Sequence, residues 1–161
     1  MRYLSGDEKK QALEYISKAA EIALQSTCDR AHCGAVIVWD GEIIGSWFNS
    51  PPGHQEDQRR CSCDKNSYHK KVTDKTCCIH AEQRAIMNTL IDTPDQIIGS
   101  RLYFVRLDKD GNPTKAGKPY CTICSKMALD AGIKEFVLRH EEWICVYDTG
   151  EYNTLSFAYT E

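Results

Sequence analysis

The sequence has no long hydrophobic run. Its longest apolar stretch extends from Gly34 to Trp39, far short of the roughly 20 residues that a membrane-spanning helix needs. The first residues, MRYLSGDEKKQ, contain neither an apolar core nor a small-residue cleavage site, so they do not resemble a secretory signal. We therefore expect no membrane association and a cytoplasmic location.

The sequence also lacks a strong net charge. It has 20 Lys and Arg against 23 Asp and Glu, which gives a formal net charge of -3 at pH 7. This balance gives no general attraction to phosphate backbones. The basic runs are short, at residues 59–60 and 69–71, and they are interpreted as solvated loops. A nucleic-acid partner is therefore not expected, and a small-molecule substrate is.

Cysteine, in contrast, is abundant. There are nine cysteines, and in a reducing compartment metal binding or catalysis explains them better than disulfides do. A chain of 161 residues buries about two-thirds of its unfolded surface and does not need disulfide support. The expectation is one domain over residues 1–161, with a Cys/His-rich insertion at about residues 50–77.

Hydrophobic periodicity and turn residues predict alternating helices and strands. Helices are predicted at residues 7–26, 79–90 and 121–131, and strands at residues 33–39, 42–49, 101–107, 133–138 and from 143. The strand-helix alternation of the second half places helices on both faces of a sheet. The fold class is therefore α/β, a three-layer α/β/α sandwich. Residues 50–76 lack periodicity and are too long for a simple connection, which suggests a loop held by metal.

Two short motifs, His-Ala-Glu and Cys-Thr-Ile-Cys, contain the residues best suited to catalysis. His80, Cys121 and Cys124 offer one imidazole and two thiolates, which fill three positions around a zinc ion and leave the fourth for water. Cys121 and Cys124 are three residues apart at the start of a predicted helix, so their sulfurs share a face. The positive end of that helix favours the thiolate form, which binds metal.

Glu82 follows His80 by two residues. It is close enough to transfer the protons of that water without occupying a coordination position. A Cys-x-x-Cys pair alone is equally consistent with a structural zinc or a redox pair, and a lone His80 is more often a core residue. The combination of these residues with Glu82 favours a catalytic zinc site.

A histidine, any residue and a glutamate, followed by Pro-Cys-x-x-Cys, is the pattern of zinc nucleobase deaminases. The sequence resembles the cytidine and deoxycytidylate deaminase superfamily, and within it the deoxycytidylate deaminases most. The resemblance includes Cys-Gly-Ala-Val-Ile-Val from Cys33, an asparagine near two prolines, Cys-Ile-His-Ala-Glu, and the Cys-x-x-Cys pair. It implies a mixed five-stranded sheet between helices, as in cytidine deaminase, and a homo-oligomer.

The same resemblance implies roles for individual residues. Zinc is expected on His80, Cys121 and Cys124, with Glu82 as the proton shuttle. Asn49 is expected to hold the sugar, and the backbone of Ala81 to meet the base, although an asparagine before Ser-Pro-Pro is also ordinary turn chemistry. The implied activity is zinc-dependent hydrolytic deamination of a cytosine nucleotide or nucleoside, with dCMP the first choice.

The chain departs from the family pattern on one wall of the pocket. Tyr120 separates Pro119 from Cys121, and residues 108–118 lengthen the strand-to-helix connection. These differences leave other aminated rings open as substrates: guanine, a pterin-like or antibiotic compound, or adenosine in tRNA. A non-catalytic zinc-binding module on the same scaffold is the alternative from another class.

The resemblance also implies a second, structural zinc in the insertion. Its candidate ligands are Cys28, Cys61, Cys63, His69 and either Cys77 or Cys78. The alternative is a set of reduced thiols without metal. The remaining cysteines, Cys33 and Cys145, are interpreted as small core residues.

Overall fold

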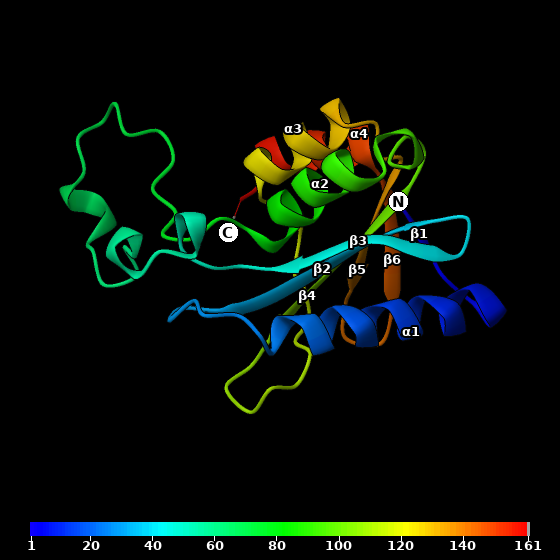
Figure 1. Cartoon of the computed structure of the whole chain (residues 1–161). Coiled ribbons are helices and arrows are strands. Elements are labelled where there is room, and N and C mark those ends of the chain that lie inside the picture. The colour runs from blue at the N-terminus through cyan, green and yellow to red at the C-terminus, as the bar shows by residue number, and fades with distance from the viewer. Residues whose placement is uncertain (161) are drawn as a thin grey trace.

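The computed structural model describes residues 1–160 as a six-stranded sheet between helices (Figure 1). Helix α1 covers one face of the sheet, and α2, α3 and α4 cover the other. The strands are β1 (Arg2–Tyr3), β2 (His32–Trp39), β3 (Glu42–Phe48), β4 (Arg101–Leu107), β5 (Glu135–Arg139) and β6 (Ile144–Asp148). The α-helices are α1 (Gly6–Ala23), α2 (Ala81–Asp92), α3 (Thr122–Asp130) and α4 (Thr149–Phe157).

The sheet is mixed and its strand order is β1-β6-β5-β4-β2-β3. Strands β4 and β5 are parallel, and all the other neighbouring pairs are antiparallel. The predicted three-layer α/β/α sandwich is confirmed, but the prediction of five strands is wrong by one. The additional strand is β1, whose two residues pair with Val146 and Cys145 of β6. A segment this short shows no hydrophobic alternation in the sequence.

Helix α1 packs closely on its face of the sheet. Ala12, Ile16, Ala19 and Ala23 are buried at helical spacing. Together with sheet residues that include Val36, Val105, Leu107 and Val137 they form the first core cluster. Gly34 of β2 makes this approach possible, because a β-carbon there would lie 2.1 Å from the carbonyl oxygen of Ala19. A glycine is therefore required where the helix crosses the strand.

The opposite face holds a second core cluster, under α2, α3 and α4. The rings of Phe136 on β5 and Tyr152 on α4 stack with centroids 4.2 Å apart. Helix α4 begins after Asp148, whose Oδ1 accepts hydrogen bonds from the backbone N–H groups of Gly150 and Glu151. This cap satisfies amide groups that the first turn of a helix leaves without partners.

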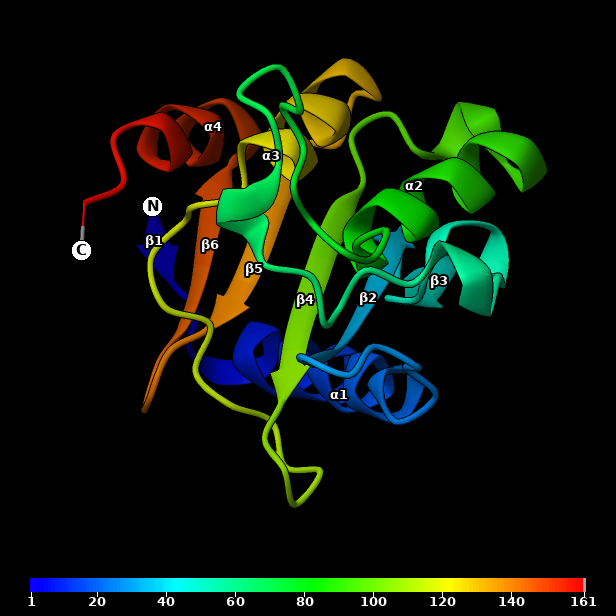
Figure 2. The same cartoon turned by 90° about the vertical axis from the view of Figure 1, so that its left-hand side faces the viewer.

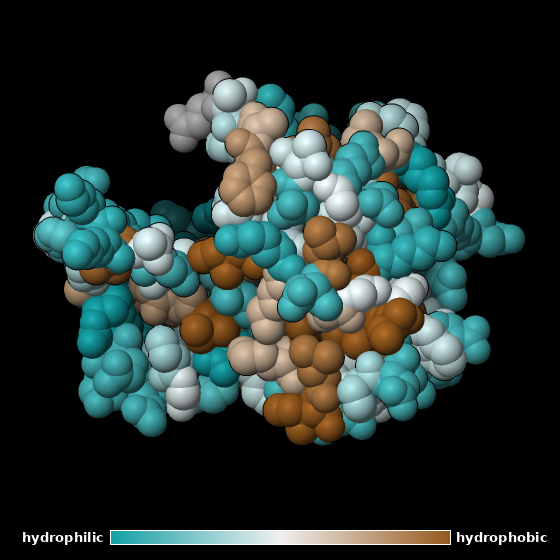
Figure 3. Space-filling view, turned by 90° about the horizontal axis from the view of Figure 1, so that it is seen from above, coloured by the Kyte–Doolittle hydropathy of each residue, from teal (hydrophilic) through white to brown (hydrophobic). Residues whose placement is uncertain are grey.

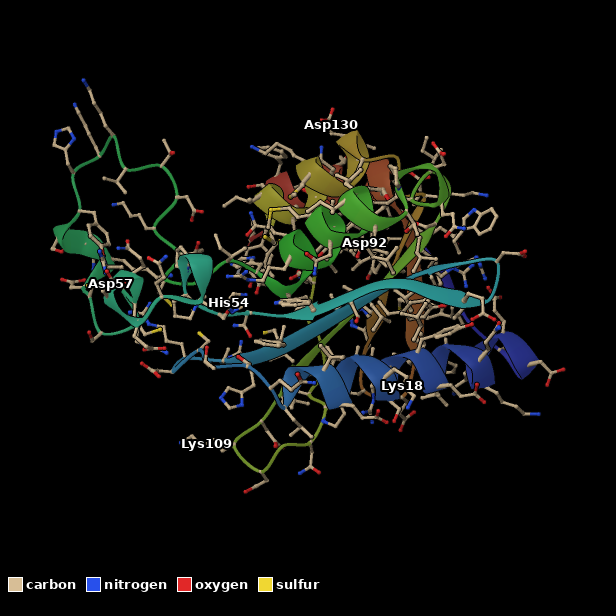
Figure 4. All side chains as sticks on the ribbon, viewed as in Figure 1. Lys18, His54, Asp57, Asp92, Lys109 and Asp130 are labelled. Atoms are coloured by element: carbon tan, nitrogen blue, oxygen red, sulfur yellow. The ribbon has the colours of Figure 1, made fainter. Side chains whose placement is uncertain are left out.

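Residues 51–78, which include the insertion expected at about residues 50–77 and are called the insertion below, extend away from the sheet (Figures 1 and 2). Its short 3-10 turns cover Pro52–His54, Glu56–Gln58 and Lys65–Ser67, and Figure 4 shows Asp57 on its outer part. An isolated bridge between Ser50 and Ile79 closes its base. The insertion therefore leaves the main body and returns to it directly before α2.

The helical face carries exposed apolar side chains among polar ones (Figure 3). They include Met87, Leu90 and Ile91 of α2 and Leu129 of α3. The expectation of a homo-oligomer stays a prediction. Among residues 1–160, no helix combines the length and the apolar character needed to cross a membrane.

Candidate active site

His80, Cys121 and Cys124 come together at the N-terminal ends of α2 and α3. The Nδ1 atom of His80 lies 3.1 Å from the Sγ atom of Cys124 and 3.4 Å from that of Cys121. All three ligand atoms lie within 4.8 Å of one another. Zinc bonds of about 2.0 to 2.3 Å in a tetrahedron place nitrogen and sulfur ligands about 3.5 Å apart. The donor set and its spacing therefore fit one zinc ion with a fourth position left open.

The two helix ends hold these ligands in place. His80 precedes α2, and its backbone N–H donates a hydrogen bond to Oε1 of Gln83 at 3.0 Å. Cys121 precedes α3, and its sulfur accepts a hydrogen bond from the backbone N–H of Cys124 at 3.4 Å. Because the positive ends of two helices point at the site, they stabilise thiolates there.

The pKa of Cys121 is lowered to about 4. The main cause is the hydrogen bond from the Cys124 thiol, which together with His80 outweighs the opposing effect of burial. Burial alone would lower the pKa of His80, but the neighbouring Cys121 and Glu82 raise it to about 9. At neutral pH Cys121 is thus a thiolate, which is the form that binds zinc.

Glu82 lies in the first turn of α2, and only 5% of its surface is exposed. It lies outside the group of three ligand atoms, but it lines the same cavity as His80. Burial raises the pKa of its carboxyl group. A carboxylate with a raised pKa is suited both to accept and to return a proton near neutral pH.

A cavity of about 230 Å³ opens onto these residues. Asn49 and Ala81, expected to contact substrate, both line it, as does Tyr120. Cys33 also lines the cavity; it is half-buried and packs against the second core cluster, so its interpretation as a core residue holds only in part. Cys145, by contrast, is buried in the second core cluster.

Most of the hydrogen-bonding capacity of Asn49 is used inside the protein. Its Oδ1 accepts hydrogen bonds from the Ser26 hydroxyl at 2.7 Å and from the Cys33 N–H at 2.8 Å. Its Nδ2 donates to the carbonyl oxygen of Ala31 at 2.8 Å. An amide nitrogen has two hydrogens, so one remains for a ligand. The position of Asn49 in the sequence does not reveal this structural role.

Four buried cysteines form a second cluster at the base of the insertion. The sulfur of Cys28 lies 4.0 Å from those of Cys61 and Cys77. The sulfur separations are 3.2 Å for Cys61–Cys77, 3.9 Å for Cys61–Cys78 and 3.7 Å for Cys77–Cys78. A tetrahedral zinc with four sulfur ligands at about 2.3 Å has sulfurs about 3.8 Å apart. The cluster therefore fits a four-thiolate metal site.

Two of the expected ligands of a second metal, Cys63 and His69, lie outside this cluster. Cys63 is half-buried, and its carbonyl oxygen accepts a hydrogen bond from Arg30. His69 is exposed, and its Nδ1 accepts from the backbone N–H of Lys71. The insertion turns these side chains away, whereas the adjacent residues Cys77 and Cys78 both reach the cluster.

Sequence reasoning missed several side chains that line the cavity, among them Arg30, Lys65, Phe104 and Arg106. Arg106 had a recognisable signal, since it is a charged residue within a strand that otherwise reads as buried. The C-terminal segment also approaches the cavity, because the rings of Tyr120 and Tyr159 lie 5.9 Å apart. Two other tyrosines near the C-terminus, Tyr147 and Tyr152, are buried in the second core cluster and do not line the cavity.

Comparison with known proteins agrees with this geometry. Residues 9–140 match the family model described as the cytidine and deoxycytidylate deaminase zinc-binding region. The dCMP deaminase of cyanophage S-TIM5 is 24% identical in its complex with dCMP and dUMP, with a TM-score of 0.55 over 83% of this chain and 81% of that chain. In its apo form the values are 23% identity, a TM-score of 0.52 and coverage of 83% and 82%.

A mutant cytidine deaminase from Mycobacterium tuberculosis is 18% identical, with a TM-score of 0.50 and coverage of 86% of this chain and 90% of that chain. These structures share the fold. Curated protein sequences give no match. Because the family model covers most of the chain and the His/Cys/Cys site is present, the chain belongs to the cytidine and deoxycytidylate deaminase family and is a zinc-dependent hydrolytic deaminase.

Proposed function

We propose that the enzyme hydrolyses the exocyclic amine of dCMP, with zinc on His80, Cys121 and Cys124 and with Glu82 transferring protons. A zinc ion in this position would supply Lewis acidity that makes water nucleophilic at neutral pH. The observation that carries the proposal is the buried carboxylate of Glu82, which lines one cavity together with His80, a member of the three-residue metal-binding group.

Glu82 can perform each proton transfer of the reaction. Its carboxylate accepts a proton from the attacking water and passes it to the ring nitrogen next to the amine-bearing carbon. The same group then takes the second proton and delivers it to the departing ammonia. Water and the amine are thereby converted into a carbonyl and ammonia, and Glu82 ends in its starting state. Burial of Glu82 keeps these transfers away from bulk water.

Two observations support dCMP over other aminated rings. The family model that matches this chain is described by the cytidine and deoxycytidylate deaminases, and the cyanophage S-TIM5 enzyme is described in complex with dCMP and dUMP. The wall on which this chain departs from the family pattern includes Tyr120, which lines the cavity. For that reason the substrate has to be tested over several ring types.

We also propose that Cys28, Cys61, Cys77 and Cys78 hold a structural zinc. Their sulfur separations fit four thiolate ligands, and all four residues are buried. Cys28, Cys77 and Cys78 line the active-site cavity as well. A metal there would therefore fix the insertion and one wall of the cavity together.

The experiment is a measurement of ammonia release from the zinc-loaded protein. The cytosine substrates are dCMP, CMP, deoxycytidine and cytidine. Guanine, a pterin and an adenosine-containing tRNA represent the other aminated rings. The highest kcat/KM is expected for dCMP. Ammonia release from a non-cytosine compound alone would change the substrate class, and inactivity on every cytosine compound would overturn the proposal.

A further inference from the structure

The active-site cavity continues into a larger outer groove of about 750 Å³. Five residues line both spaces and therefore form the neck between them: Arg30, Ala31, Phe104, Arg106 and Tyr120. The outer groove extends along the end of β4 and along the connection after it, residues 108–118, which is called the excursion below. Figure 4 shows Lys109 on this excursion, on the side of the molecule away from α2.

Arg106 projects from β4 toward the face that carries the active site. Phe104 packs against the second core cluster, while Val105 and Leu107 belong to the first. Since side chains alternate along a strand, Arg106 lies on the same face as Phe104. Its backbone carbonyl accepts hydrogen bonds from the N–H and the hydroxyl of Thr114. The excursion thus fixes the end of the strand from which the guanidinium extends.

The positive charge of Arg106 is not neutralised within the part of the chain that the structure describes. It is exposed and forms no ion pair among residues 1–160. An exposed arginine normally remains hydrated. At the neck of a cavity, however, its positive charge attracts an anionic ligand that enters the cavity. The guanidinium offers several N–H donors in one plane, an arrangement that matches phosphate oxygens.

Arg30 provides a second guanidinium at the same neck and is held in position. Its Nε donates to the carbonyl oxygen of Cys61 at 2.6 Å, and its Nη2 donates to that of Cys63 at 3.0 Å. Both partners are neutral carbonyl groups, so they orient the side chain without cancelling its charge. The neighbouring Asp29 is paired instead with Arg59 at 3.1 Å.

The other charged groups of the outer groove leave the neck positive. Asp108 accepts hydrogen bonds from the backbone N–H groups of Asp110 and Asn112. Lys115 is paired with Glu141. Asp110 and Lys109 are adjacent at the exposed turn and oppose each other in charge. Among the described residues, Arg30 and Arg106 are therefore the two cations that line both the inner cavity and the outer groove, whereas Lys65 lines the inner cavity alone.

We propose that Arg106, assisted by Arg30, binds the 5′-phosphate of the substrate and makes the enzyme prefer nucleotides to nucleosides. The inference rests on the proposed function, in which the base lies beside Glu82 and the sugar between the base and the neck. A monophosphate attached to that sugar then extends into the neck, where both guanidinium groups can donate to its oxygens. The larger outer groove gives the phosphate access to solvent.

The test compares Arg106→Gln with the wild-type enzyme on dCMP and on deoxycytidine. Loss of a charged hydrogen-bonding group is expected to lower the ratio of the two kcat/KM values, dCMP over deoxycytidine, about 10- to 100-fold. Arg106→Lys keeps the charge but not the planar donor pair, and is expected to recover part of the ratio. An unchanged ratio in Arg106→Gln would overturn the inference.

Lys115→Gln is the matched control. Lys115 lines only the outer groove and is paired with Glu141, so the ratio should stay at the wild-type value. Arg106 is the primary variant because Arg30 also holds the insertion through its two carbonyl contacts. Circular dichroism of each variant establishes that the fold is retained.

Calorimetric binding of dUMP and deoxyuridine to the same proteins separates the two proposals. The wild-type protein is expected to bind dUMP more tightly, and Arg106→Gln is expected to lose that difference. If the wild-type protein binds dUMP more tightly than deoxyuridine, Arg106→Gln loses this preference, and no substrate releases ammonia, the inference is retained and the proposed function is rejected. Equal affinity of the wild-type protein for dUMP and deoxyuridine would reject the inference, whatever the enzyme deaminates.

Discussion

Cys78 and His80 are two residues apart in the chain, and their side chains belong to two different clusters. The sulfur of Cys78 lies 3.9 Å from that of Cys61, and the Nδ1 atom of His80 lies 3.1 Å from the sulfur of Cys124. Between them the N–H of Ile79 donates to the carbonyl oxygen of Ser50 at 3.0 Å. One short segment therefore closes the insertion and positions the first ligand of the active site.

Glu82→Gln is expected to retain zinc and the fold but to lose about 10²- to 10⁴-fold in the rate of ammonia release. Glutamine has nearly the same shape as glutamate, but it cannot accept a proton from water. The measurements are ammonia release on dCMP, zinc content by mass spectrometry and circular dichroism.

Glu14→Gln is the control for this variant, since Glu14 is exposed on α1 and should leave all three measurements unchanged. Unchanged turnover in Glu82→Gln would rule out the role of Glu82 as proton shuttle. It would also favour a different proton acceptor in the cavity.

Cys61→Ser is expected to reduce the zinc content from two ions per chain to one. A serine hydroxyl is a poor replacement for a thiolate ligand, and metal binding contributes directly to the free energy of unfolding. The melting temperature should fall by about 10 °C or more. Metal analysis and thermal unfolding monitored by circular dichroism check both expectations.

Cys63→Ser is the matched control for the thiol cluster. Cys63 lies in the same insertion, but its side chain is outside the cluster of Cys28, Cys61, Cys77 and Cys78. This variant should keep both zinc ions. If Cys63→Ser loses an ion while Cys61→Ser keeps both, the ligand set proposed for the structural zinc is wrong.

Asn49→Ala is expected to destabilise the protein by about 2 to 4 kcal/mol. The substitution removes the partners of the buried Ser26 hydroxyl and of the part-buried Cys33 N–H and Ala31 carbonyl. A fully buried group left unsatisfied costs about 1 to 3 kcal/mol, and a part-buried one costs less. Urea unfolding measures the loss. The exposed Asn66 provides the comparison, and an equal effect of Asn66→Ala would contradict a structural role for Asn49.

The sequence predicts the core of the candidate site because its residues are tied to local structure. His80 and Glu82 lie at the start of one helix, and Cys121 and Cys124 at the start of another. Short spacings at helix ends determine side-chain direction. Cys63 and His69 could not be excluded in the same way, since the insertion has no periodicity from which the path of the chain can be inferred.

The fold shows the same distinction between strong and weak patterns. Strand β4 covers Arg101–Leu107 as predicted, because its apolar run is bounded by clear turn residues. Helix α4 was missed, since its sequence is rich in Thr, Gly, Ser and Asn, which are poor helix formers. Its buried face consists of Thr149, Tyr152 and Ser156. The helix is therefore stabilised by its cap and by packing rather than by an amphipathic pattern.

Glu8 is expected to make the stability of the protein depend on pH. Its carboxylate accepts hydrogen bonds from Arg2 at 2.7 and 2.8 Å and from Arg101 at 3.1 Å. The hydrogen bond from Arg2 is the main cause of a pKa lowered to about 2, compared with about 4.3 in an unfolded chain. The resulting stability is present above pH 4.3 and is lost as the pH falls toward 2.

Glu8→Gln should therefore lower the free energy of unfolding at pH 7, by about 1 kcal/mol because the pair is partly exposed to solvent. The difference from the wild-type protein should stay constant above about pH 5 and shrink below about pH 4. Both proteins have the same zinc ligands, so the difference isolates Glu8 from acid release of the metal. Urea unfolding at several pH values measures it, with Glu21→Gln as the control because the Lys18–Glu21 pair is more exposed. A difference that persists unchanged at about pH 3 would show that Glu8 acts through packing and not through its charge.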